Sequence, residues 1–149
     1  MKRIEQKLRE IEDSLAVIDE GIPENEEDFS SAGLIKDGIY KRLEFCIQNV
    51  IDIFSMIYSS QRLGVPGTVD DIFTGFLKKG LFPKKIILLA EEMKGMRNVL
   101  VHKYGEIDDA RVYAFLTERM GDFQKIVGAV EEYLKKQEKK NSGQKKLNA

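Results

Sequence analysis

Apolar residues recur at helical spacing along most of the chain. In residues 2–20, five apolar side chains follow one another at alternating steps of four and three residues. This is the narrow seam of an amphipathic helix. Its members are Ile4, Leu8, Ile11, Leu15 and Ile18. Gly21 and Pro23 predict the end of this helix, and the acidic stretch 23–27 predicts a loop.

A longer apolar series predicts the second helix. We expect it to begin near Asp28 or Ser30, either of which suits an N-cap, and to reach about Ser60. Such a length is typical of the central helix of a bundle. Residues 64–67, Gly-Val-Pro-Gly, predict a break. The stretch 68–71 then resembles a capping box, with aspartate in place of the usual glutamate, and starts a short helix.

The second half of the chain predicts two more long helices. Gly80 ends the short helix, and Pro83 suits the first turn of the next, which carries apolar residues as far as Leu100. Gly105 is a suitable C-terminal stop for that helix, and Asp108 an N-cap for the last one.

The pattern as a whole predicts an all-α, up-and-down bundle of about five helices. It contains no alternating strand pattern, internal repeat or glycine-rich phosphate loop. We expect residues 1–135 to form the helical domain. Residues 136–149 form a lysine-rich stretch that we expect to be disordered.

Composition and charge narrow the possible classes of protein. The chain has 149 residues, 42% of them hydrophobic, which suits one domain with a real core. Its 24 basic and 25 acidic residues argue against a protein that coats nucleic acid, but they permit a small local RNA site. No segment approaches the ~20 apolar residues of a membrane span, and the N-terminus has no signal-peptide core. We expect a soluble, cytoplasmic protein.

Metal and cofactor chemistry find little support in the sequence. Cys46 is the only cysteine, and its apolar surroundings indicate a buried thiol. Without a Cys/His cluster the sequence offers no structural zinc site. We therefore expect no metal and no cofactor.

One segment, residues 93–108, carries candidate chemistry because it contains the only histidine. Asn98 and His102 are four residues apart, so they share a helix face and can form a hydrogen bond. Arg97 and His102 are five apart, about 140° around a helix and about 7.5 Å along it. Both reach one phosphate only if the arginine bends toward it or a second helix supplies one of the groups.

These residue types suit cleavage of RNA without a metal. Carbonyl groups at a helix C-terminus favour a protonated imidazole, and a histidine that titrates near neutral pH suits acid–base catalysis. Arginine presents a fork of donors that matches phosphate oxygens. The reaction needs two proton-transfer groups, whereas the chain has one histidine. A twofold symmetric dimer would supply the second copy, so we predict an obligate dimer.

The spacing alone also fits a purely structural role for these residues. Helix C-termini often carry basic side chains that only cap the helix. On that interpretation Arg97 and His102 have no catalytic role, and Tyr104 is a half-buried aromatic residue.

The longer string is more specific. Arg97-Asn98-Val99-Leu100-Val101-His102-Lys103-Tyr104 resembles the motif of the HEPN superfamily, in particular its HepT-like toxin branch. The pattern there is arginine, a polar residue, three or four more residues, histidine, any residue and tyrosine. The order of the helices and the stretch VPGTVDDIF are similar as well, and the resemblance covers roughly residues 1–135.

The resemblance implies a helical homodimer that acts as a ribonuclease toxin. Arg97 and His102 carry over as catalytic residues, and Asn98 as their polar support. The implied partner is a minimal nucleotidyltransferase antitoxin that transfers AMP to Tyr104, where a bulky anion would compete with RNA phosphate for Arg97. Two alternatives stay open: a non-catalytic subunit that binds a nucleotide or the transferase, and a pure scaffold.

Overall fold

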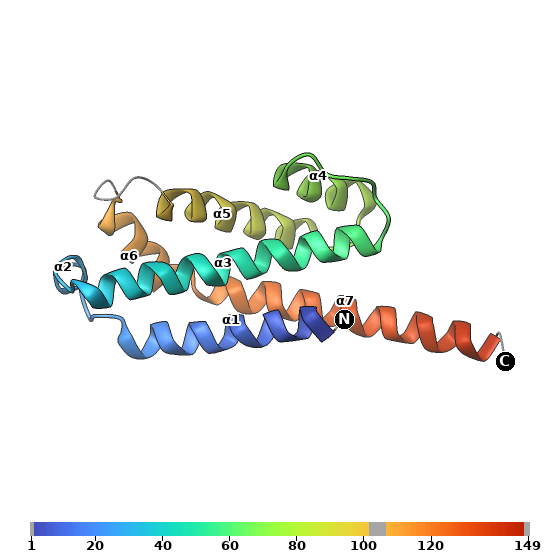
Figure 1. Ribbon diagram of the computed structural model, residues 1–149, viewed down its shortest axis with the longest axis horizontal. Helices are drawn as coiled ribbons and strands as arrows, with labels where there is room; N and C mark the ends of the chain where they lie inside the picture. The colour runs from blue at the N-terminus through green and yellow to red at the C-terminus, as the bar shows by residue number, and fades with distance from the viewer. Residues whose placement is uncertain (1, 102–106, 148–149) are drawn as a thin grey trace.

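A computed structural model describes residues 2–101 and 107–147, together with the side chains of all these residues except 145–147. Four long helices form the body of the molecule: α1 (Lys2–Gly21), α3 (Leu34–Ser60), α5 (Lys84–Leu100) and α7 (Gly121–Leu147). Three short helices lie at its ends: α2 (Glu26–Ser30), α4 (Val69–Lys79) and α6 (Asp109–Glu118) (Figure 1).

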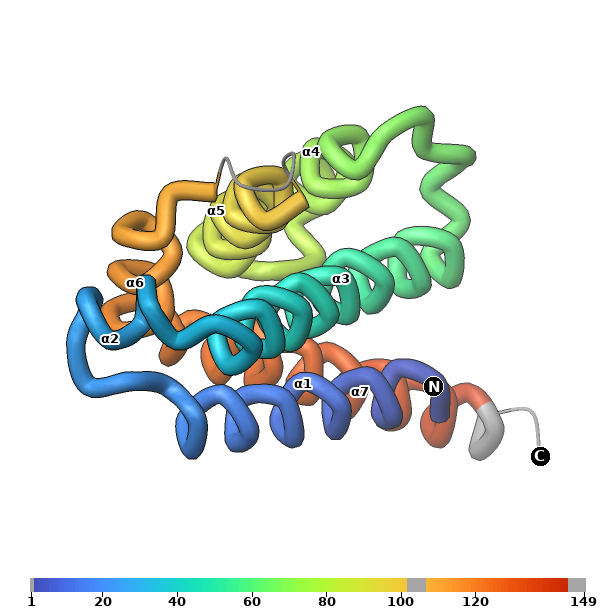
Figure 2. Tube along the Cα trace, turned by 60° about the vertical axis from the view of Figure 1, so that its left-hand side comes forward, coloured from blue at the N-terminus to red at the C-terminus, as the bar shows by residue number. Residues whose placement is uncertain are grey.

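The long helices pack in sequence order. α1 packs against α3, α3 against α5, and α5 against α7. Leu8 of α1 and Leu134 of α7 line one groove, so the first helix also lies beside the last (Figure 2). The predicted all-α bundle is confirmed, and the described residues contain no strand.

The apolar seams predicted from the sequence form the core. Ile4, Leu8, Ile11 and Ile18 are buried along α1. At the α3–α4 end of the molecule, Phe54 stands edge-on to Phe73, Phe76 and Phe82, with ring centroids 5.2–6.0 Å away. Such edge-to-face contacts add to the burial energy of aromatic side chains.

The predicted ends of α4 are confirmed. Thr68 and Asp71 exchange the two hydrogen bonds of a capping box, and Gly80 ends the helix in the left-handed conformation, with φ +63°. The close approach of α4 to α3 depends on a second glycine, Gly75. A Cβ there would lie 2.7 Å from the Tyr58 ring, which leaves no room for a larger residue.

The expected start of the second helix is wrong. Asn25, not Asp28 or Ser30, is the cap: its side chain accepts a hydrogen bond from the backbone N–H of Asp28 at 2.9 Å and starts the separate short helix α2. α3 begins after Gly33, whose φ of +58° favours glycine. This glycine breaks what had been predicted as one continuous helix.

The expected last helix is also divided, so the described chain has seven helices instead of about five. Asp108 caps α6, as predicted, but α6 ends at Glu118 and α7 starts at Gly121. Between them, the Asp122 carboxylate accepts a hydrogen bond from Arg119 Nε at 2.7 Å, which holds the turn.

The lysine-rich segment differs from our expectation as well. Instead of being disordered from residue 136, the chain continues α7 as a helix to Leu147. Lysine, glutamate and glutamine have high helix propensity, and a helix that is already nucleated by tertiary packing is extended at little cost. This part of α7 projects beyond the rest of the bundle (Figure 1).

Candidate active site

α5 presents the candidate arginine. Met93, Met96 and Leu100 are buried on its inner face, and Arg97 lies four residues after Met93, on the edge of that same face. The Arg97 side chain is therefore half-buried, whereas the next residue, Asn98, is exposed. The aliphatic stem of an arginine can pack against apolar neighbours in this way while its charged end stays accessible.

The hydrogen bonding of Arg97 is incomplete. Its Nε atom is buried, yet it has no hydrogen-bond partner among the described groups. A buried donor without an acceptor costs roughly 1–3 kcal/mol, so it is seldom retained without a reason. The oxygen atoms of a bound anion are acceptors of the kind that this donor lacks.

Two ion pairs fix the position of α5 relative to its neighbours. Lys94 Nζ lies 2.7 Å from Asp70 Oδ1 at the start of α4. At the far side, Glu92 accepts a hydrogen bond from Arg119, which also pairs with Asp122 at the α6–α7 turn. These two carboxylates raise the pKa of Arg119. The helix that carries Arg97 is thus held from both sides.

A second cluster begins just after the motif, at the start of α6. The Asp109 carboxylate accepts a hydrogen bond from Lys36 Nζ at 2.9 Å and another from the Tyr40 hydroxyl, both from α3. Burial alone would raise the pKa of Asp109, but the hydrogen bonds from Tyr40 and Lys36 hold it below its usual value. Burial and the same carboxylate raise the pKa of Tyr40.

This cluster, Lys36–Tyr40–Asp109, fixes the segment that follows the motif. Asp108 caps α6 by accepting a hydrogen bond from Arg111 N at 3.3 Å, and the adjacent Asp109 ties the same turn to α3. No local sequence pattern predicts this cluster, because Asp109 lies 73 residues from Lys36 and 69 residues from Tyr40. Only the acidic residue in the first turn of a helix was recognisable beforehand.

The structure describes two of the four predicted site residues. Arg97 and Asn98 lie in the last turns of α5, as expected. His102 and Tyr104 lie outside the described residues, so their geometry relative to Arg97 stays a prediction. Cys46 is buried as expected, and burial raises the pKa of its thiol to about 12.

Two further observations concern metals and membranes. Among the residues that the structure describes, no three histidine, cysteine or acidic side chains converge into a possible metal site. No described helix is both long and apolar enough to cross a bilayer. The metal-independent reaction stays a prediction.

Fold and site together define an all-helical domain with a half-buried arginine at the end of α5 and a hydrogen-bonded carboxylate cluster at the start of α6. Comparison with known proteins agrees with this class. Residues 4–130 match the family model described as ribonuclease HepT-like. The chain therefore belongs to the HepT-like ribonuclease family, and its resemblance to the HEPN superfamily is confirmed.

Individual relatives are more distant. The mRNA nuclease HepT of Shewanella oneidensis is 27% identical over 96 residues, which are 64% of this chain and 72% of that protein. A crystal structure of a toxin–antitoxin with AMP-PNP has a TM-score of 0.79 and 23% identity, covering 89% of this chain and 99% of the other. A tri-AMPylated HEPN toxin of S. oneidensis in complex with an MNT antitoxin has a TM-score of 0.77 and 24% identity, covering 87% and 96%. At these identities the solved structures support the fold.

Proposed function

We propose that this protein is the toxin of a toxin–antitoxin pair of type VII character and acts as a metal-independent endoribonuclease. Its site is composite: Arg97 and His102 of two identical subunits meet at one cleft. The observation that carries this proposal is Arg97, a half-buried arginine whose buried Nε has no partner among the described groups. An RNA phosphate supplies the missing acceptor together with a compensating charge.

The reaction follows from these residue types. The ribose 2′-oxygen attacks the adjacent phosphorus while an imidazole accepts its proton. The bond from phosphorus to the 5′-oxygen breaks, and a second, protonated imidazole donates a proton to that oxygen. The products are a 2′,3′-cyclic phosphate and a 5′-hydroxyl. Arg97 stabilises the negative charge that develops on the phosphoryl oxygens, and Asn98 orients His102 or the substrate.

A homodimer supplies the two imidazoles. Three exposed apolar side chains on α3 and at the end of α5 favour such an interface: Leu34 is 88% exposed, Phe45 41% and Val101 50%. Large exposed apolar residues are typical of a surface that a partner covers. Val101 directly follows α5, so an interface there brings the two copies of Arg97 toward each other.

Regulation follows from the same cleft. The cognate antitoxin, a minimal nucleotidyltransferase, transfers AMP from ATP to the Tyr104 hydroxyl and releases pyrophosphate. The added phosphate then occupies Arg97 and excludes RNA. The relative in complex with an MNT antitoxin carries three AMP groups, which supports this proposal.

Substitution of the site residues tests the proposal. Arg97→Ala and His102→Ala should each abolish cleavage of RNA and the growth arrest caused by expression, while gel filtration still shows a dimer. Lys85→Ala, an exposed lysine at the start of α5, serves as the control and should retain cleavage. If either site variant cuts RNA as fast as the wild type, the catalytic assignment is wrong.

Modification is tested separately. Intact-mass measurement after co-expression with the transferase should show additions of AMP to the wild type and none to Tyr104→Phe, which stays toxic. If the transferase still silences Tyr104→Phe, the acceptor lies elsewhere. The alternative function is a non-catalytic subunit that binds a nucleotide or the transferase; it predicts tight ATP or partner binding and no toxicity on expression alone.

A further inference from the structure

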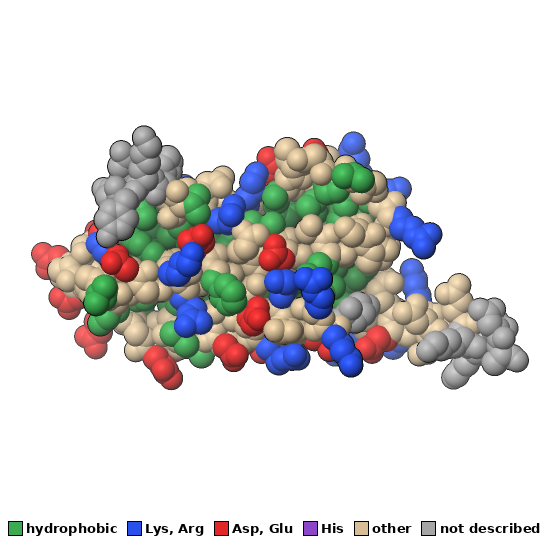
Figure 3. Space-filling view, in the orientation of Figure 1, with side chains coloured by type: hydrophobic (Ala, Val, Ile, Leu, Met, Phe, Trp, Pro, Cys, Tyr) green, Lys and Arg blue, Asp and Glu red, His purple; other side chains and the backbone are tan. Residues whose placement is uncertain are grey.

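The charges of this protein are unevenly divided between its bundle and the extension of α7. Residues 135–149 hold six lysines and one glutamate, whereas residues 1–134 hold 18 basic and 24 acidic residues. Figure 3 shows acidic side chains gathered at the α2 end of the molecule and basic ones toward the opposite end. An acidic domain repels RNA at long range, so a ribonuclease of this charge needs a basic element elsewhere.

The extension is a continuous helix, and this gives its lysines a defined arrangement. At about 100° per residue, Lys135, Lys136, Lys139 and Lys140 fall within an arc of about 140° on one side of α7. All four are exposed. None forms an ion pair with a described acidic side chain. We call these four residues the lysine stripe.

The opposite side of the same helix has a different character. Gln137 and Asn141 face a groove that they share with Ile4 of α1 and Ile57 of α3. The uncharged side of the extension therefore faces the bundle, and the lysine stripe is exposed, with Lys135 also at the edge of the groove between α7 and α1. A helix whose lysines only served solubility would not need to segregate them in this way.

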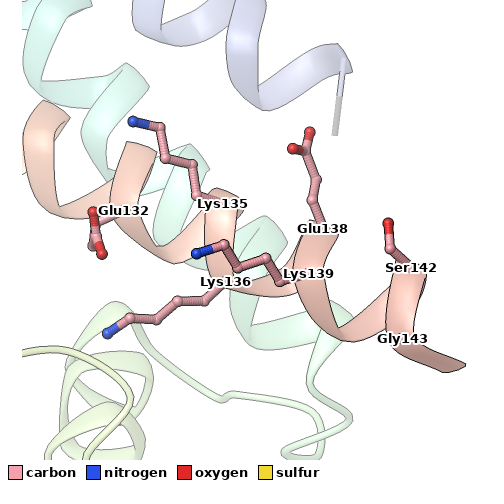
Figure 4. Close-up of a pocket in the computed structure, with 7 residues that line it drawn as sticks. All are labelled: Glu132, Lys135, Lys136, Glu138, Lys139, Ser142 and Gly143. Carbon is pink, nitrogen blue, oxygen red and sulfur yellow. The ribbon is translucent and has the colours of Figure 1, made fainter.

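Figure 4 shows how the stripe is presented. Lys135, Lys136 and Lys139 stand on adjacent turns of α7 and line one open pocket, together with Glu132, Glu138, Ser142 and Gly143. The two glutamates weaken the positive potential at the start of the extension. Beyond Glu138 the sequence contains four more lysines and no acidic residue.

We propose that the lysine stripe of α7 binds the phosphate backbone of single-stranded RNA. Lysine ammonium groups on a flexible stem suit repeated phosphates read without regard to base sequence. The HepT-like family model matches residues 4–130, so the match does not include the lysine stripe. The inference rests on the proposed ribonuclease function.

The test compares two variants of equal charge. One replaces all four residues of the stripe with glutamine, which preserves helix propensity. The control replaces four other exposed lysines with glutamine: Lys78, Lys79, Lys84 and Lys85. The probe is a fluorescent single-stranded RNA with 2′-O-methyl groups, which cannot undergo attack by the 2′-oxygen, and its dissociation constant is measured between 50 and 200 mM salt.

We expect the stripe variant to bind the probe more weakly at low salt and to lose most of its salt dependence. On single strands, each phosphate contact adds about 0.7 to the slope of the logarithm of affinity against the logarithm of salt concentration. Four contacts therefore make the affinity of the wild type fall about fifty-fold more between 50 and 200 mM salt than the affinity of the stripe variant. The control should keep the wild-type slope. Glu138→Gln should tighten binding, because it removes a carboxylate from the stripe's edge. On a dinucleotide substrate too short to reach α7, the stripe variant should keep the wild-type kcat.

The results that overturn the inference differ from those that overturn the proposed function. Suppose that the wild type cleaves RNA. If the stripe variant then binds the probe with an unchanged salt dependence, or if the stripe and control variants lose affinity equally, the stripe does not bind RNA. If instead the stripe variant changes only its oligomeric state in sedimentation, the stripe binds an acidic protein surface. If the wild type cleaves no RNA at all, the proposed function itself is wrong.

Discussion

The start of the sequence motif and the segment that follows the motif are built in opposite ways. Within the motif, at the end of α5, Arg97 has a buried donor with no hydrogen-bond partner among the described groups. After it, at the start of α6, the Asp109 carboxylate is satisfied by Lys36 and Tyr40 and also lies at a helix N-terminus, where negative charge is favoured. On the proposed function, the first group awaits a ligand, whereas the second stabilises the fold.

The difference in hydrogen bonding between Arg97 and Asp109 bears on the stability of the folded protein. A satisfied carboxylate lowers the free energy of the folded state, whereas an unsatisfied arginine raises it unless an anion is bound. Strained or unsatisfied groups in native proteins concentrate at functional sites. The comparison thus contrasts the catalytic role proposed for Arg97 with a structural role for Asp109, and substitutions can test it.

The largest effect is expected from Arg97→Met, which keeps the length of the side chain and removes its charge. We expect RNA cleavage to fall by about 100-fold or more, the usual cost of losing a group that stabilises transition-state charge. The free energy of unfolding should stay equal or rise, because the variant buries no unpaired donor. Single-turnover cleavage and urea denaturation measure the two quantities. A variant that loses both activity and stability would place Arg97 in the structural framework instead.

The motif illustrates what the sequence predicted well. Helix periodicity identified α1, α4 and α5, and local capping chemistry identified the ends of α4, since these signals depend on neighbouring residues. The same local patterns placed Arg97 in the last turn of α5. The order of elements therefore followed from sequence, as did one half of the candidate site.

Other features depend on contacts that no local pattern reveals. The break between α2 and α3 rests on a left-handed Gly33, and the turn between α6 and α7 on the bond from Arg119 to Asp122. In both places the apolar spacing continues across the break, so periodicity alone predicted one helix. Asp109 was recognisable only as a first-turn acid, because Lys36 and Tyr40 come to it from a distant helix.

The next largest effect is expected from a substitution of Asp109, the hydrogen-bonded carboxylate at the start of α6. Asp109→Ala removes the acceptor of both Lys36 and Tyr40, and we expect it to lower the free energy of unfolding by about 1–2 kcal/mol, since the groups are partly exposed. Urea denaturation measures this loss. The matched control is Asp70→Ala, which breaks the more exposed pair with Lys94 and should cost less. Equal losses in the two variants would mean that the Tyr40 hydrogen bond adds nothing.

The smallest effect is a pH dependence that belongs to Asp109. Its pKa is lower in the folded protein than in the unfolded chain, where an aspartate titrates at 3.8. The stabilisation is therefore fully present above that unfolded value and is lost as the pH falls through the lower, folded pKa. Between pH 7 and pH 3 we expect the difference in melting temperature between wild type and Asp109→Asn to shrink, because acid protonates the wild-type carboxylate while the asparagine does not titrate. A difference in melting temperature that stays constant down to pH 3 would mean that Asp109 is not stabilised in its charged form. Arg97 and Asp109 would then differ less than their hydrogen bonds indicate.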